Sequence, residues 1–272
     1  ILPLLAILGL FFIGPIVIIF VVSFWDYTEF SLVPDFVLTN YVELFESNVT
    51  YSIYLNTLKF AALSWVLTLI IGFVIAHFLA FHVRGLKWQI ILFLVCTIPF
   101  WTSNIIRMIA WIPVLGRHGL VNKALVNAGL IDKPLEWLLY SDFAVVLAFV
   151  HLYALFMVVP IFNSMMRIDK SVLEAARDAG ANALQVLIYV IIPLCRPGIA
   201  IGTIFVVSLV MGDFVTVQAM SGGQSASVGV AMNHKRALLQ YPAAAADAVI
   251  LLIVVLVMVA MLMRTVNIRK EL

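Results

Sequence analysis

The sequence contains few charged residues. Asp, Glu, Lys and Arg together make up 11% of its 272 residues, whereas hydrophobic residues make up 64%. Soluble domains average about a quarter charged residues, so this chain has too few charges to cover a water-exposed surface. The composition excludes a soluble domain and indicates an integral membrane protein. The net charge of +2 is nearly neutral, and we expect no nucleic acid among its partners.

Cysteine is also scarce. The chain has only Cys96, inside an apolar run, and Cys195, close to Pro193. The two are widely separated in the sequence, so we predict no disulfide and expect ordinary packing at both positions.

Catalytic motifs are missing as well. No G-x-x-x-x-G-K-[ST] phosphate loop, no H-E-x-x-H pair and no metal-ligand spacing occurs, and the five histidines are scattered. These absences disfavour an intramembrane enzyme. We expect the chain to bind no metal or cofactor and not to bind ATP through a phosphate loop.

Long apolar runs dominate what is present. A helix needs about 20 apolar residues to cross a bilayer, and six segments qualify, so we predict an all-α polytopic protein with one domain over residues 1–272. The predicted spans are residues 1–24, 60–81, 88–112, 144–165, 198–217 and 244–263. Pro15 makes the first span prone to kink.

The third span is unusual. Its purely apolar part, residues 90–100, is too short to cross, so it must continue to Trp111 with a bend at Pro99. Two structures fit: one long kinked helix, or a helix followed by a re-entrant piece.

Basic residues predict the orientation. Lys and Arg are concentrated in residues 82–87, 166–196 and 264–270, whereas residues 26–56 hold five acids and no Lys or Arg. By the positive-inside rule, the loop 166–196 and the C-terminus are cytoplasmic and the acid-rich loop is outside. Lys235 and Arg236 run against this trend.

The loop 166–196 holds a polar island in the apolar chain. Ser171 and Glu174 have the spacing of a capping box, in which each side chain bonds to the other residue's backbone N–H. Gly180 suits a left-handed helix end. Asn182 then caps a second helix, which Pro193 stops.

The order of residues in this island resembles a known motif. Glu174-Ala175-Ala176, Gly180, Val190 and Ile192-Pro193 look like the EAA motif of binding-protein-dependent ABC importers. The resemblance extends over most of the chain, including residues 98–107, and is greatest to the spermidine/putrescine permeases. It implies the transmembrane domain of a type I importer in a bacterial inner membrane.

The resemblance also implies partners and coupling residues. The permease would work with two ATPase copies that bind ATP and Mg²⁺, a second permease subunit and a soluble substrate-binding protein docked on the outer loops. A short capped helix with small alanines can approach an ATPase closely. The expected coupling residues are Ser171, Glu174, Ala175, Ala176, Arg177, Asp178, Gly180 and Pro193.

A second set of candidates concerns the substrate. Ionisable residues inside membrane helices are costly and functional by default. Asp213 either attracts a cationic substrate, or lies at the membrane boundary or pairs with Arg107. Trp101 and Trp111 either offer a cation–π surface or belong to an interfacial aromatic belt. The candidate path residues are Trp101, Thr102, Asn104, Arg107, Asp213 and Phe214.

Two functional hypotheses remain at this stage. The first is a permease subunit of an ATP-driven importer for a small cationic amino compound, polyamine-like or related. The second is an ion-gradient-driven secondary transporter or channel that uses Asp213 as a proton or ion site. The EAA spacing favours the first.

Overall fold

A computed structural model describes residues 7–28 and 31–265 of the chain. These residues are almost entirely helical; a short hairpin pairs β1 (Asp26–Tyr27) antiparallel with β2 (Leu32–Val33). The all-α prediction is confirmed. The start of the first predicted span and the basic residues Arg269 and Lys270 lie outside the described residues.

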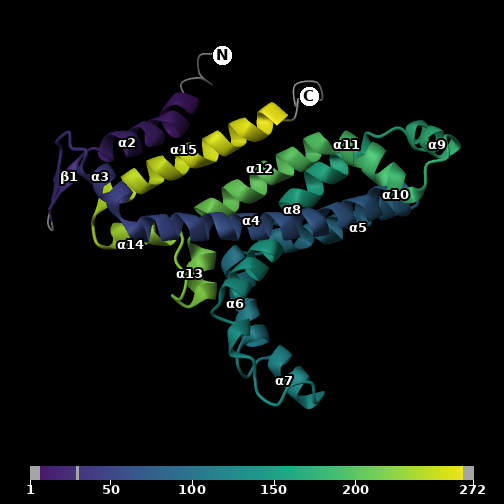
Figure 1. Ribbon diagram of the computed structural model, residues 1–272, viewed down its shortest axis with the longest axis horizontal. Coiled ribbons are helices and arrows are strands. Elements are labelled where there is room, and N and C mark those ends of the chain that lie inside the picture. Colours follow the sequence, from purple (N-terminus) through teal and green to yellow (C-terminus); the bar gives the residue numbers. More distant parts are fainter. Residues whose placement is uncertain (1–6, 29–30, 266–272) are drawn as a thin grey trace.

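Three long helices form the centre of the molecule. They are α4 (Asn48–His77), α8 (Asp142–Met166) and α12 (Arg196–Gly212), which lie along one another (Figure 1). Small residues allow the close approach, as is usual in membrane helix packing. A Cβ atom on Gly198 would lie 2.4 Å from the Pro160 carbonyl oxygen, and one on Gly202 would lie 2.6 Å from the Met157 sulfur. Side chains such as Phe60 and Phe149 fill the space between these helices.

Two helices lie beside this bundle. The C-terminal α15 (Tyr241–Thr265) packs against α2 (Gly14–Val22), which follows a π-helical turn, η1 (Gly9–Ile13) (Figure 1). Large apolar side chains cover their outer faces; Phe11 is 73% exposed and Met261 is 63% exposed. Such surfaces suit lipid or another membrane subunit rather than water.

The fourth and sixth predicted spans coincide with α8 and α15, which have the length and apolarity to cross a bilayer. The second begins at Asn48 rather than near residue 60, because the Ser47 hydroxyl accepts the Thr50 N–H at 3.3 Å and starts the helix early. Helix α4 continues through a π-helical turn, η2 (Phe78–His82). Residues 48–56 are therefore helix and not outer loop; the helix α3 (Thr39–Glu46) precedes them.

The predicted count of six spans is not confirmed. Within residues 7–28 and 31–265, three helices have the length and apolarity to cross a bilayer, or up to five if each of two sharply bent pairs counts as one span. The described part of the first predicted span, Gly9–Val22, is a shorter apolar helix.

The third predicted span consists of two pieces. Helix α5 (Leu86–Thr97) runs into a 3₁₀ turn, η3 (Ile98–Trp101), and the chain then bends by 89° into α6 (Asn104–Leu115) and α7 (Leu120–Asn127). The predicted bend at Pro99 was wrong: Pro99 lies at the start of η3, where its missing N–H costs little. The break follows at Thr102, whose hydroxyl donates to the Pro99 carbonyl at 2.7 Å.

The fifth predicted span ends early. Helix α12 stops at Gly212, and after Asp213 and Phe214 a new helix, α13 (Val215–Ser221), begins. The predicted end at residue 217 was wrong because the Asp213 carboxylate accepts the Thr216 N–H at 2.9 Å and starts a second helix. After α13 the chain forms α14 (Val228–Ala237) and then α15.

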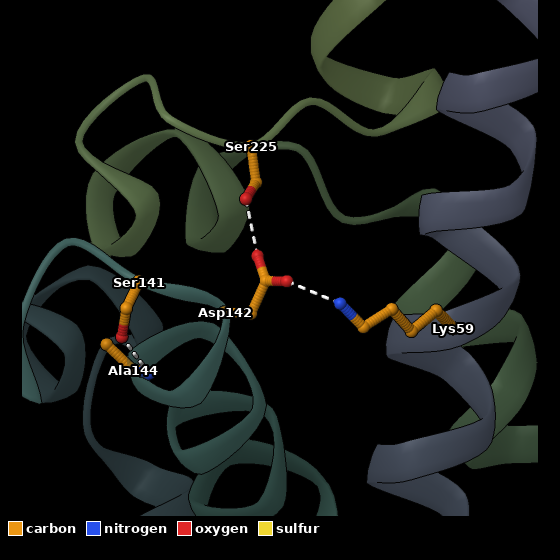
Figure 2. A network of polar contacts seen from close by, with 5 residues as sticks. All are labelled: Lys59, Ser141, Asp142, Ala144 and Ser225. Atoms are coloured by element: carbon orange, nitrogen blue, oxygen red, sulfur yellow. Dashed lines mark hydrogen bonds and ion pairs between the residues drawn. The ribbon is translucent and has the colours of Figure 1, made fainter. Parts of the chain in front are cut away.

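A polar network joins three segments at the end of the bundle near α14. The Lys59 ammonium of α4 lies 2.6 Å from Asp142 Oδ2 at the start of α8, and the Ser225 hydroxyl, between α13 and α14, donates to Asp142 Oδ1 (Figure 2). Ser141 caps α8 by accepting the Ala144 N–H at 3.2 Å. A second ion pair at this end joins Lys235 of α14 to Asp247 of α15.

Candidate functional site

The polar island folds as predicted into two short helices at the opposite end of the bundle from α14 (Figure 1). The first, α9 (Lys170–Asp178), is capped by Asp169, whose Oδ1 accepts the Ser171 N–H at 3.0 Å. This bond lowers the pKa of the Asp169 carboxyl because it favours the charged form. The predicted Ser171–Glu174 capping box was wrong, since the helix begins before Ser171 and places it inside the first turn.

The turn after α9 confirms the prediction for Gly180. Its φ of +87° is in the left-handed region, where a Cβ is strained. The Ala181 N–H bonds to the Ala176 carbonyl at 3.1 Å and the Gly180 N–H to the Arg177 carbonyl at 2.8 Å, which together close the helix. The angle between α9 and the next helix is thus fixed by the backbone.

Asn182 begins the second helix, as predicted. Its Oδ1 accepts the Gln185 N–H at 2.9 Å, and Gln185 Oε1 accepts the Asn182 N–H at 2.8 Å, so the capping box of this island is here. Gln185 was missed, although its spacing of three residues from Asn182 was a visible signal.

Pro193 does not stop the second helix. The helical run passes from α10 (Ala183–Val186) through a π-helical turn, η5 (Leu187–Ile191), into α11 (Ile192–Leu194), and bends by 65° before α12. The prediction was wrong because the wider π turn directly before Pro193 tolerates its missing N–H. The bend falls at Cys195. Cys195 and Cys96 are not joined by a disulfide in the described part of the chain.

Helix α9 has one face against the chain and one face open. Leu173 is buried in the core and Ala176 is half-buried, whereas Glu174, Ala175, Arg177 and Asp178 are exposed. The side chains of Glu174, Arg177 and Asp178 make no hydrogen bond or ion pair with any residue in the described ranges. The EAA residues therefore lie on a capped helix with an exposed face. Tyr189 on η5 is 74% exposed.

Asp213 lies in the second candidate site and is already hydrogen-bonded by its own chain. Its Oδ2 accepts the Tyr153 hydroxyl at 2.7 Å and the Thr216 hydroxyl at 2.6 Å. No ion pair between Asp213 and Arg107 exists among the described residues; Arg107 donates to Asn104 Oδ1 at 2.5 Å instead. Sequence reasoning missed Tyr153, because a tyrosine inside an apolar span carries no distinctive signal.

The remaining path residues lie on neighbouring elements. Helix α6, which carries Asn104 and the buried Arg107, packs against α8 and α13. The Trp111 indole N–H donates to His151 Nδ1 at 3.0 Å, and Trp101 at the end of η3 is 86% exposed. Phe214 is half-buried beside Gly229. The structure thus brings α6 close to the Asp213 segment but leaves Trp101 on the surface.

Comparison with known proteins identifies the family. The chain is 34% identical over 194 residues to the spermidine/putrescine permease PotB of Escherichia coli, covering 71% of this chain and 69% of that protein. It is 32% identical over 221 residues to PotB of Haemophilus influenzae, covering 80% and 76%. The chain belongs to the family of ABC importer permeases.

Other comparisons agree with this permease assignment. The chain is 30% identical over 224 residues to YdcU, an inner membrane ABC transporter permease of Escherichia coli. The matched region covers 77% of this chain and 70% of YdcU. A bacterial ABC transporter that imports alginate superimposes with a TM-score of 0.76 at 18% identity over 97% of this chain and 92% of that one, which shows a shared fold. No family model matches. This permease is therefore a transport component and not an enzyme.

Proposed function

We propose that this permease forms the translocation path of an ATP-driven importer for a small cationic amino compound. The observation that carries the proposal is α9: capped at both ends, packed on the bundle through Leu173, and open along Glu174, Ala175 and Arg177. A rigid helix of this kind can transmit a partner's movement to the spans. The PotB relatives, named for spermidine and putrescine transport, support the substrate class.

The proposed assembly follows from the family. Two ATPase copies would bind ATP and Mg²⁺ and receive α9, a second permease would complete the path, and a soluble binding protein would deliver the substrate. One similar fold is that of an alginate transporter in complex with its periplasmic protein, which supports the last partner. The α9 end and the C-terminus would be cytoplasmic and the α14 end would face the binding protein, in line with the basic residues around α9.

Asp213 fits this function, and the ABC permease relatives weigh against ion-driven transport. The Asp213 carboxylate accepts three hydrogen bonds, one from the Tyr153 hydroxyl and two from Thr216, which hold it in one position. A fixed negative charge beside the path would attract an ammonium group. We therefore retain Asp213 and Arg107 as path residues and do not favour the secondary transporter.

The test is co-purification of the tagged chain from membranes in mild detergent, with ATPase activity measured against a panel of polyamines and other amino compounds. We expect an ATPase to co-purify and one compound, with its binding protein, to stimulate it. If the chain elutes alone after cross-linking in the membrane, or if uptake in proteoliposomes needs only an ion gradient, the proposal is wrong.

A further inference from the structure

A large cavity lies beside α9 at the end of the bundle. It has a volume of about 960 Å³ and lies between the end of α4–η2, the start of α5, the end of α8, and α9 with α10. Two of the candidate membrane spans, Asn48–His82 and Asp142–Met166, end at this cavity. It therefore lies at the level of a bilayer surface, where headgroups lie.

The charged residues on the cavity wall are mainly basic. Arg84, Lys170 and Arg177 line it, with His77 and His82 as further polar groups, and Glu174 is the only acid among its lining residues. None of the three permanently charged side chains takes part in an ion pair within the described part of the chain. The excess of positive charge is thus left for an anionic ligand.

The backbone adds further donors. Gly85 precedes α5 with φ +92° and no side chain caps this helix. The N–H groups of Leu86 and Lys87 have no backbone acceptor among the residues described, so the first turn presents donors of the kind that bind phosphate oxygens. The Gln89 amide donates to the Leu79 carbonyl at 3.1 Å and fixes α5 against η2. The basic turn is therefore held in place before any ligand arrives.

Apolar side chains surround this charge. Leu86 and Leu184, both on the cavity wall, are 68% and 63% exposed, and Trp88 on the adjoining surface is 60% exposed. Tryptophan prefers the membrane interface. A soluble anion would make no favourable contact with these apolar side chains. A phospholipid would, because its acyl chains can pack against them while its phosphate meets the basic residues.

We propose that this cavity binds the headgroup of an anionic phospholipid, with its phosphate at Arg84, Lys170 and the first turn of α5. The lipid would touch α9, η2 and α5 at once and so would tie the proposed coupling helix to the bundle. The binding proposal itself does not depend on the transported substrate or on ATP hydrolysis.

The test is native mass spectrometry of the permease, alone and in its complex, released from nanodiscs of phosphatidylglycerol and phosphatidylethanolamine. We expect retained phosphatidylglycerol, and about a fivefold weaker retention for each charge removed in Arg84→Gln and in the double variant Arg84→Gln/Lys170→Gln. Arg196→Gln is the matched control: it removes one exposed charge at the start of α12, at a position outside the cavity wall and the first turn of α5, and should retain lipid like the parent chain.

Three outcomes would overturn the proposal. They are equal retention by Arg84→Gln and Arg196→Gln, equal retention of phosphatidylethanolamine and phosphatidylglycerol, and displacement of the lipid by millimolar inorganic phosphate, which would assign the cavity to a soluble phosphate. Arg84 is exposed, so we expect Arg84→Gln to unfold at the same temperature as the parent chain. A thermal unfolding measurement therefore serves as the control for folding.

Discussion

The two ends of the bundle differ in whether their charged residues form ion pairs within the chain. At the α14 end, Lys59 pairs with Asp142 and Lys235 pairs with Asp247 across different helices (Figure 2). At the α9 end, Glu174, Arg177 and Arg84 make no such pair within the described residues. Charges at the first end hold the chain's own segments together. Charges at the second end are left for other molecules, which is where the proposed ATPase and lipid contacts lie.

The largest expected effect is the loss of the ion pair of Lys235. Asp247 is 3% exposed and its Oδ2 lies 2.7 Å from the Lys235 ammonium, without the alignment of a hydrogen bond. Lys235→Met leaves a buried carboxylate unpaired and should lower the free energy of unfolding by about 3 kcal/mol. Thermal unfolding of the parent chain and the variant in detergent measures this difference in stability. The double variant Lys235→Met/Asp247→Asn should recover most of the loss; an equal loss in both variants would show that the pair does not matter.

The next effect concerns coupling at the α9 end. Gly180→Ala forces a Cβ into a left-handed position at a cost of about 1–2 kcal/mol, which should turn α9 away from its partner and lower uptake about tenfold while ATP hydrolysis continues. Glu174→Ala should act in the same direction. Gly129→Ala is the matched control, because Gly129 ends α7 with φ +69° and, like Gly180, has open space around it. Unchanged uptake in Gly180→Ala would refute the coupling role.

A smaller effect is expected between the two ends. Asp213→Asn removes the proposed attraction for a cation and should lower uptake about fivefold, with less change in basal ATPase activity. Tyr153→Phe keeps the charge and removes one hydrogen bond of 2.7 Å, so its loss should be smaller. Transport of radiolabelled amino compounds separates the two variants. Equal losses of uptake and ATPase activity would indicate a structural role for Asp213.

The smallest effect is predicted for the network in Figure 2. The side chains of Lys59 and Asp142 are 50% and 39% exposed, and water screens such pairs. Lys59→Met should change the free energy of unfolding by no more than about 0.5 kcal/mol, and added salt should reduce the difference. If Lys59→Met lowered the free energy of unfolding as much as Lys235→Met, burial would not explain the difference expected between these two ion pairs.

Hydropathy predicted the long apolar helices α8 and α15, and the polar residues of the loop 166–196 predicted α9 and its Gly180 turn. The errors fall where one polar side chain decides a helix end. Asp169 competed with Ser171 for the cap of α9, and Asp213 ended α12 by capping α13. The pattern of apolar residues cannot predict which side chain caps a helix. It reports which residues are buried, whereas the cap depends on a local hydrogen bond to the first turn.

The break in the third predicted span has a similar cause. Both α5 and α6 are largely apolar, so hydropathy cannot separate one kinked helix from two pieces at 89°. The bond from Thr102 to the Pro99 carbonyl decides the matter locally. Partners across space were equally hidden: nothing in the sequence pairs Tyr153 with Asp213 or Lys235 with Asp247.

The close fit of α8 and α12 has a mechanical consequence. Because Gly198 and Gly202 bring the α12 backbone close to Pro160 and Met157 of α8, we expect the two helices to tilt together rather than separately. A movement that reached the bend at Cys195 through α10 and α11 would then displace both helices, and the displacement at the far end of the bundle would depend on their length.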